Sequence, residues 1–189
     1  MMRTALLLFL LAGCATEPVP SPQPLAPEAP QPIAADVPDD TEWTSEPIVL
    51  PGEASDVVVT EMRVAAHLDA APGYDRVVFE FEGGQPGVDV RTVDAATACG
   101  SGEPLAVPGA SILYVSLIGA RGFTEDGTET IRHSPGSPRL PALIGTVPAC
   151  DFEGRLEWAL GLASPEAYRI TRLHNPERLA VDIRHPLPD

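Results

Sequence analysis

Histidine and acidic side chains are the first candidates for chemistry, because three or four such groups can hold a zinc ion when they converge. His67 and Asp69 lie close together in the sequence. The other histidines are scattered through later segments, at His133, His174 and His185. This spacing favours isolated surface or turn histidines over a metal centre. We therefore expect no bound metal and no cofactor.

Two groups of carboxylates could also do chemistry. Glu80 and Glu82 share one face of a predicted strand and could form a pair for glycan cleavage. A solvated strand face explains the same spacing and is favoured. Residues 125–129, E-D-G-T-E, have the composition of a calcium loop but lack the alternating ligands of an EF-hand. They favour a solvated hairpin turn at Asp126 and Gly127.

Sequence motifs of common catalytic sites are missing. The sequence has no G-x-S-x-G, no H-E-x-x-H and no Gly-rich phosphate loop of the right spacing. Charged neighbours such as Asp75 and Arg76, or Arg178 and Asp182, are most simply structural ion pairs. The residues alone therefore indicate a binding or structural module and not an enzyme.

Two cysteines, Cys99 and Cys150, are available for a disulfide. An even pair in an exported domain favours a structural disulfide over the alternatives, which are two free thiols or a redox pair. No C-x-x-C supports the redox alternative. Both cysteines are expected in loops. A bridge that closes a loop of about 50 residues could add about 4 kcal/mol of stability in the chain-entropy model.

The charge of the chain excludes some partners. All 12 basic residues are arginines, and the formal net charge is −15. Residues 52–189 carry 20 acidic residues against 11 arginines. Because phosphate contacts need basic patches, we expect no nucleic-acid partner and no binding of the domain surface to anionic lipid.

The clearest structural signal is the stretch 73–83, G-Y-D-R-V-V-F-E-F-E-G. Val77, Phe79 and Phe81 fall on one face of an extended strand, whereas Arg76 and Glu80 fall on the other. A glycine stands at each end. This alternation predicts a half-buried β-strand whose apolar face lies in the core.

Similar patterns recur along the rest of the domain. They predict strands at 57–67, 88–93, 111–118, 143–147, 155–162, 169–173 and 178–183. In the first of these, Val58, Met62 and Val64 are expected on one face. Ser164 could start a single helical turn. About eight short strands with Gly- and Pro-rich connections predict an all-β fold, an antiparallel β-sandwich with little helix.

The N-terminus has the features of a secretory signal, residues 1–13. Arg3 precedes an apolar run, 5–12, that is much shorter than the about 20 residues of a membrane-spanning helix. The run ends in L-A-G-C, which resembles the lipobox of bacterial lipoproteins and implies lipidation (palmitate or another acyl chain) at Cys14. The alternatives are a plain cleaved signal or a buried cysteine. In a cell with two membranes, Ala15 would favour the outer one.

The segment that follows, 14–51, is predicted to be a disordered tether. Ten of residues 15–51 are proline, seven are acidic and none is basic. Such a composition cannot bury enough apolar surface to fold and favours extended polyproline II. Its reach is on the order of 100 Å. Near its end, Trp43 and residues 48–50 are expected to pack onto the domain, which is predicted over 52–189.

Four motifs resemble known families. Residues 175–183, N-P-E-R-L-A-V-D-I, resemble the N-P-x-R-L-V-V-D motif of AMIN domains. The stretch 73–80, G-Y-D-R-V-V-F-E, with Arg63 and His67 before it, is similar to the AMIN-like domain of bacterial lipoproteins. So are 100–104, G-S-G-E-P, and 151–154, D-F-E-G. The resemblance implies a β-sandwich that localises envelope proteins, and some AMIN domains bind peptidoglycan.

The functional expectation follows from these features together. It is a membrane-anchored lipoprotein of the cell membrane or outer membrane, whose domain lies in the periplasm or cell-wall space and binds peptidoglycan or another wall glycan. Tyr74, Arg76 and Arg178 are the predicted contact residues, with an aromatic face for sugar rings and guanidinium groups for carboxylates and amides. The alternative is a protein-interaction adaptor that uses an exposed sheet edge. An enzyme with an unrecognised site is the least favoured, and a deep pocket with convergent polar groups would revive it.

Overall fold

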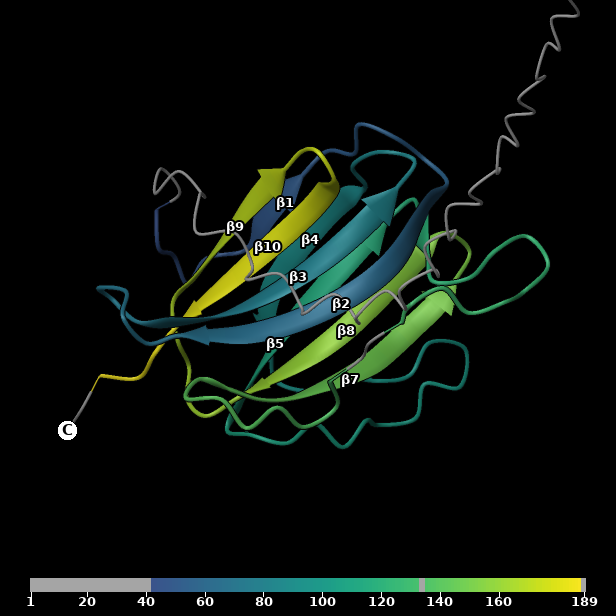
Figure 1. Cartoon of the computed structure of the whole chain (residues 1–189). Helices are drawn as coiled ribbons and strands as arrows, with labels where there is room; N and C mark the ends of the chain where they lie inside the picture. The colour runs from purple at the N-terminus through teal and green to yellow at the C-terminus, as the bar shows by residue number, and fades with distance from the viewer. Residues whose placement is uncertain (1–41, 133–134, 188–189) are drawn as a thin grey trace, which may run out of the picture. The chain divides into compact units, whose positions relative to one another are not determined.

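Strands with one apolar face build two β-sheets that pack face to face (Figure 1). The structure is a computed structural model and describes residues 42–132 and 135–187. Sheet 1 has the order β6 (Ala120–Arg121), β2 (Val57–His67), β3 (Tyr74–Glu82), β10 (Glu177–Arg184), β9 (Tyr168–Leu173). Sheet 2 has the order β1 (Ile48–Leu50), β4 (Gly87–Val93), β5 (Ser111–Ile118), β8 (Arg155–Leu162), β7 (Leu143–Phe152). Neighbouring strands are antiparallel except β2 and β6. The predicted all-β sandwich is confirmed.

The core lies between the inward faces of the two sheets. Val77, Phe79 and Phe81 of β3 are all buried, as their alternation predicts. Phe79 contacts Trp158 of β8, with ring centroids 5.4 Å apart. Burial of each such side chain contributes about 1.5–3 kcal/mol relative to its exposure to water. This contact across the two layers fixes which face of each sheet is left outside.

Strand β2 departs from the predicted pattern. Its register against β3 shifts between Val59 and Glu61, which marks a β-bulge at Thr60. Because one extra residue reverses the alternation, Val57 and Val59 point inward before the bulge and Met62 after it. The prediction that Val58 shares the face of Met62 is therefore wrong, since Val58 is only partly buried.

Several other predictions differ from the observed structure. The short strands β1 and β6 were not expected, and β7 runs on to Phe152, so that Cys150 lies in a strand and not in a loop. No helical turn forms at Ser164, where the side chain instead donates to Glu166. The turn at Asp126 and Gly127 is confirmed, and Gly127 has a φ of 84°.

A long loop, residues 94–110, crosses the outer face of sheet 2. It joins β4 to β5, although these strands are direct neighbours. The Cys99 amide donates to the carbonyl of Ala149 in β7, at 3.0 Å. The disulfide Cys99–Cys150, with a Cα–Cα distance of 5.2 Å, adds a covalent link and confirms the predicted pairing. We call residues 94–110 the strap.

Glycines in β7 and β8 let the strap lie against the sheet. A Cβ atom at Gly161 would lie 1.8 Å from the carbonyl oxygen of Pro108. A Cβ atom at Gly145 would lie 2.4 Å from Cγ of the same proline. No other residue type fits at these two positions without displacing the strap.

The residues before Gly52 are part of the fold. Thr44 forms an isolated bridge with Tyr168 at the start of β9, and β1 pairs with β4. The Tyr168 hydroxyl donates to the Glu46 carbonyl at 2.6 Å. The expected packing of Trp43 and Ile48–Leu50 onto the domain is therefore confirmed. Cys14, the signal segment and most of the predicted tether lie outside the described residues.

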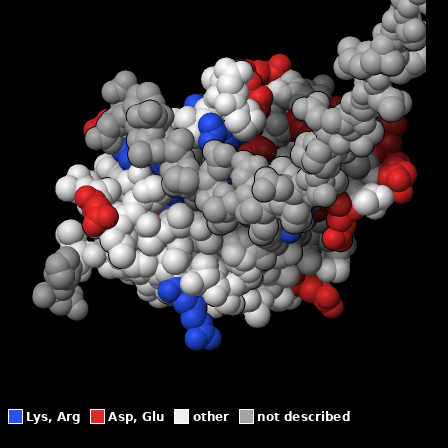
Figure 2. Space-filling model, viewed as in Figure 1, with Lys and Arg blue, Asp and Glu red and all other residues white. Residues whose placement is uncertain are grey.

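The surface keeps the acidic character of the sequence. Figure 2 shows several groups of acidic side chains on the right of the view and only a few basic ones. Within the described ranges, no helix is long and apolar enough to cross a membrane.

Candidate functional site

The predicted contact residue Arg76 lies on the outer face of sheet 1 but is not solvated. Its side chain is 1% exposed and makes two bonds to Asp182 of β10, from Nε at 2.6 Å and from Nη2 at 2.9 Å. Arg169 of β9 donates to the same carboxylate at 2.9 Å. The solvated strand face predicted for Glu80 and Glu82 therefore does not extend to Arg76. Its ion-pair partner is Asp182 and not, as expected, Asp75, because the antiparallel register places Asp182 directly opposite.

The expected ion pair between Arg178 and Asp182 is also wrong. Four residues along one strand span about 13 Å, which is too far for contact between these side chains. Arg178 is partly buried, and its Nε donates to the Pro176 carbonyl at 3.3 Å. It lies opposite Glu80 in the register, away from Tyr74.

Tyr74 is the centre of a cluster of rings and guanidinium groups. The His67 ring stacks on it at 4.5 Å between centroids, and the Trp43 ring lies 6.1 Å away. The guanidinium carbons of Arg76 and Arg169 lie 5.2 and 5.3 Å from its centroid. The structure thus brings Tyr74 and Arg76 together and leaves Arg178 apart. Contact of these three residues with a ligand stays a prediction.

His67 belongs to this cluster and has a lowered pKa. Burial is the main cause, and the positive charge of Arg76 adds to it. Its Nε2 atom is buried and has no hydrogen-bond partner among the described residues. The neutral imidazole is therefore the form that the fold favours.

The remaining described histidines have carboxylate partners. His185 contacts buried Asp75 at 2.7 Å, and Asp75 also accepts the backbone amides of Ala142 and Leu143. His174 contacts Glu177 at 2.8 Å. His174 lies in a turn, as expected. Neither histidine is isolated, however, because each contacts a carboxylate. Within the described ranges, no three His, Cys, Asp or Glu side chains gather in a way that could hold a metal ion.

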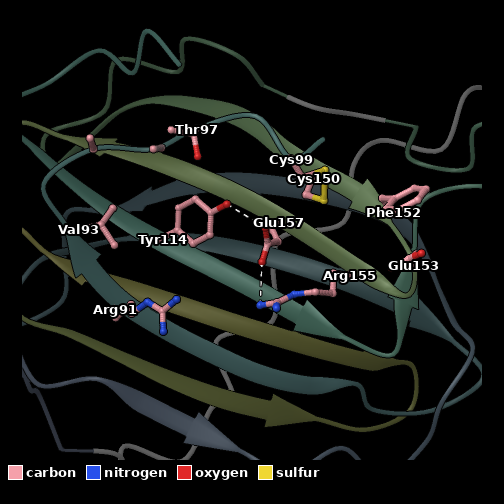
Figure 3. Close-up of a pocket in the computed structure, with 12 residues that line it drawn as sticks. Arg91, Val93, Thr97, Cys99, Tyr114, Cys150, Phe152, Glu153, Arg155 and Glu157 are labelled. Atoms are coloured by element: carbon pink, nitrogen blue, oxygen red, sulfur yellow. Dashed lines mark hydrogen bonds and ion pairs between the residues drawn. A yellow bond between two sulfur atoms is a disulfide. The ribbon is translucent and has the colours of Figure 1, made fainter. Parts of the chain in front are cut away.

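A hollow of about 450 Å³ lies on the opposite side of the sandwich, on the outer face of sheet 2. Strands β4, β5 and β8 supply one side of it, through Arg91, Tyr114 and Glu157. The strap and the disulfide supply the other, through 95–97, Cys99 and Cys150 (Figure 3). We call this hollow the strap pocket.

Glu157 is the most buried charge of the strap pocket and is held by three donors. The Tyr114 hydroxyl donates to Oε2 at 2.9 Å, and the Ser116 hydroxyl donates to Oε1 at 2.8 Å. Nη2 of Arg155 lies 3.1 Å from Oε1. Burial, and then the hydrogen bond to Glu157, raise the pKa of Tyr114 to about 12. The phenol therefore stays a donor to the carboxylate at neutral pH.

Two arginines and one phenyl ring stand at the rim of the strap pocket. Figure 3 shows Arg91, Arg155 and Phe152 around the Tyr114–Glu157 pair. The side chains of Arg91 and Arg155 are 46% and 52% exposed. Nη1 of Arg91 donates to Asp89 at 2.8 Å. Phe152 is 61% exposed.

Sequence reasoning missed the strap pocket. Tyr114, Ser116 and Glu157 were seen only as members of two strands with strong apolar patterns. The available signal was that these polar residues occupy the outward positions of otherwise apolar strands. The path of the strap could not be predicted, because the pairing of Cys99 with Cys150 does not say which face of the sandwich the loop around Cys99 crosses.

A second hollow, of about 410 Å³, lies on the other side of the disulfide and is lined by Trp158, Ile131, Glu129 and Asp151 among others. Asp151 accepts the amide of Gly122 at 3.0 Å. Burial is the main cause that raises the pKa of Asp151, and the nearby Glu129 adds to it.

The fold and this surface define a β-sandwich with a polar hollow on one outer face. A comparison with protein families matches the AMIN-like domain to residues 57–185. The match runs from the first residue of β2 to one residue beyond β10. The chain therefore belongs to the AMIN-like domain family. Neither the search of curated proteins nor the search of solved structures found a match.

Proposed function

We propose that this protein is a membrane-anchored envelope lipoprotein whose AMIN-like domain binds peptidoglycan or another wall glycan without catalysis. The observation that carries the proposal is the family match over 57–185, since the AMIN domains that this chain resembles localise envelope proteins and in some cases bind peptidoglycan. The L-A-G-C sequence at Cys14 supports the lipid anchor. In this proposal the domain lies in the periplasm or wall space.

The strap pocket supports the binding role. It presents hydrogen-bond donors, acceptors and an aromatic ring from three strands and a covalently tied loop. Binding sites of this kind combine apolar walls with a few fixed polar groups, often in hollows of about 300–1,000 Å³. Glu157 is held in place by three described donors, which suits a binding site better than a proton-transfer site.

Sedimentation with purified sacculi tests this proposal. The full chain, purified in detergent, should co-pellet with sacculi and should be displaced by soluble wall fragments. An unrelated lipoprotein of similar negative charge serves as the control. If the chain stays in the supernatant across a range of pH and salt, wall binding is wrong, and an adaptor that uses the sheet edge at β1, where Val49 is 66% exposed, becomes the better proposal.

The contacts proposed on sheet 1 need a separate variant. Tyr74 and Arg76 contribute to the fold, so their replacement would confuse binding with stability. Arg178→Gln changes a guanidinium whose only described side-chain bond is a 3.3 Å contact to a carbonyl. We expect weaker co-pelleting if this face contacts the wall. Arg139→Gln, at an exposed arginine of the loop before β7, is the matched control.

A further inference from the structure

The strap pocket has a balanced set of charges, which restricts its ligand. Among the residues that line it, Arg91 and Arg155 carry positive charge, and Glu153 and Glu157 carry negative charge. Arg155 is already paired with Glu157, and Arg91 with Asp89. Because both positive charges are already paired and the domain carries excess negative charge, the pocket offers an anionic ligand no net attraction. A cationic ligand would meet two guanidinium groups, and the charge of Glu157 is already paired with Arg155.

Neutral hydroxyl and amide groups match the remaining hydrogen-bonding capacity. A guanidinium has five N–H donors, and Arg91 and Arg155 each use only part of this set in their described ion pairs. Oε2 of Glu157 accepts one described bond, from Tyr114, although a carboxylate oxygen can accept about two. The Tyr114 oxygen can itself accept a bond while it donates to Glu157. Donors and acceptors therefore lie side by side at fixed positions.

Apolar groups complete the pocket. Val93, Ala95 and Ala96 line it beside the disulfide, and Phe152 stands at its rim. These groups suit a methyl group and the C–H face of a ring. Together with the polar groups, they match a sugar ring that carries an acetamido group: its N–H can donate to a carboxylate or phenol, its carbonyl can accept from a guanidinium, and its methyl group can lie on the apolar wall.

We infer that the strap pocket binds a neutral, N-acetylated sugar ring through Arg91, Arg155 and the Tyr114–Glu157 pair. This inference rests on the proposed wall-glycan function and makes it more specific. It assigns the contact to the sugar backbone of the wall polymer and not to its charged peptide groups. It also places the ligand on sheet 2, on the opposite side of the sandwich from Tyr74 and Arg76.

Calorimetric titration of the full chain in detergent tests the inference with four probes. These are a β-1,4-linked tetramer of N-acetylglucosamine, its deacetylated and cationic form, cellotetraose, and a tetrapeptide with two free carboxylates. We expect only the N-acetylated tetramer to bind with a measurable Kd. Arg91→Gln and Arg155→Gln should each weaken that binding about tenfold, because each removes charge-assisted hydrogen bonds. Arg139→Gln should leave it unchanged.

Folding and the proposed binding to sacculi are measured with the same preparations. Thermal unfolding shows whether each variant is folded, and Tyr114→Phe gives a second, conservative change at the pocket. Tighter binding of a charged probe, equal binding of cellotetraose, or unchanged affinity in both arginine variants would overturn the inference. Co-pelleting with sacculi without any saccharide binding overturns the inference alone. Loss of both overturns the proposed function as well.

Discussion

At the scale of single residues, Asp182 is the key position of sheet 1. Its carboxylate accepts from both Arg76 and Arg169 within a nearly dry environment. Removal of one partner of a buried ion pair is costly because it leaves an uncompensated charge. Loss of Asp182 should therefore cost more stability than loss of either arginine, because it leaves two buried guanidinium groups without their anion.

The corresponding prediction concerns Asp182→Asn. We expect it to lower the free energy of unfolding by about 3–5 kcal/mol, because Arg76 and Arg169 lose their common anion. Arg169→Gln should cost less, since the bidentate bond of Arg76 remains. Urea unfolding with an unchanged m value measures both. A cost below about 1 kcal/mol for Asp182→Asn would show that the two arginines find other compensation.

His67 gives a pH-dependent prediction. Its pKa in the folded protein lies below the ordinary value of 6.5, mainly through burial. As the pH falls below that value, the unfolded chain takes up the proton first, so this residue makes the fold less stable in mild acid. The midpoint of thermal unfolding should therefore fall more between pH 7.5 and pH 5 in the natural chain than in His67→Phe. Equal slopes in the two proteins would contradict this.

The sequence alone predicted the core positions of β3 but not the ion pairs on its outer face. The alternation in β3 identified Val77, Phe79 and Phe81 as core, because period-two burial is a local property. It could not identify the partner of Arg76, because the partner depends on the register between β3 and β10, which are about one hundred positions apart in the sequence. Adjacent charges in the sequence therefore suggested the wrong ion pairs.

At the scale of elements, the path of the strap cannot be predicted from the alternation of apolar and polar residues in the strands. Strand existence follows from local alternation. Seven strands were predicted at or near their bounds, and β7 was predicted to end too early, at 147. The two missed strands, β1 and β6, have three and two residues, too few to show a period. The path of the strap is fixed by the disulfide and by Gly145 and Gly161, which leave room for Pro108. The role of these two glycines can be recognised only once β7 and β8 are known to be neighbours.

Loss of the disulfide should loosen the strap more than the sheets. Cys99→Ser with Cys150→Ser removes a link between positions 51 residues apart, and we expect a loss of up to about 4 kcal/mol in the chain-entropy model. Hydrogen exchange should rise first at the strap amides, including that of Cys99, while β5 and β8 stay protected. A uniform rise across both sheets would contradict the separate role of the strap.

At the scale of the whole molecule, the proposed anchor and the folded domain are joined by the segment that ends at β1. Cys14→Ser should move the protein from the membrane to the soluble fraction, because it removes the site of the proposed acyl chains. Cell fractionation followed by immunoblotting measures this, and Cys99→Ser is the matched control for loss of a cysteine. Retention of the Cys14→Ser chain in the membrane would contradict the lipid anchor.

The short contacts at the N-terminal side of the domain have a mechanical consequence. If the chain is anchored in the membrane at Cys14 and bound to a wall polymer, as proposed, it is pulled when the membrane and the wall separate. The load then reaches first the bridge between Thr44 and Tyr168, which has two hydrogen bonds, and next the three-residue strand β1. These contacts can peel in sequence and lengthen the tether before the long central strands carry force. In the proposed binding mode the polymer is held at the strap pocket, where the disulfide ties the strap to β7. This covalent link does not peel with β1, so we expect the grip on the polymer to outlast the first extension.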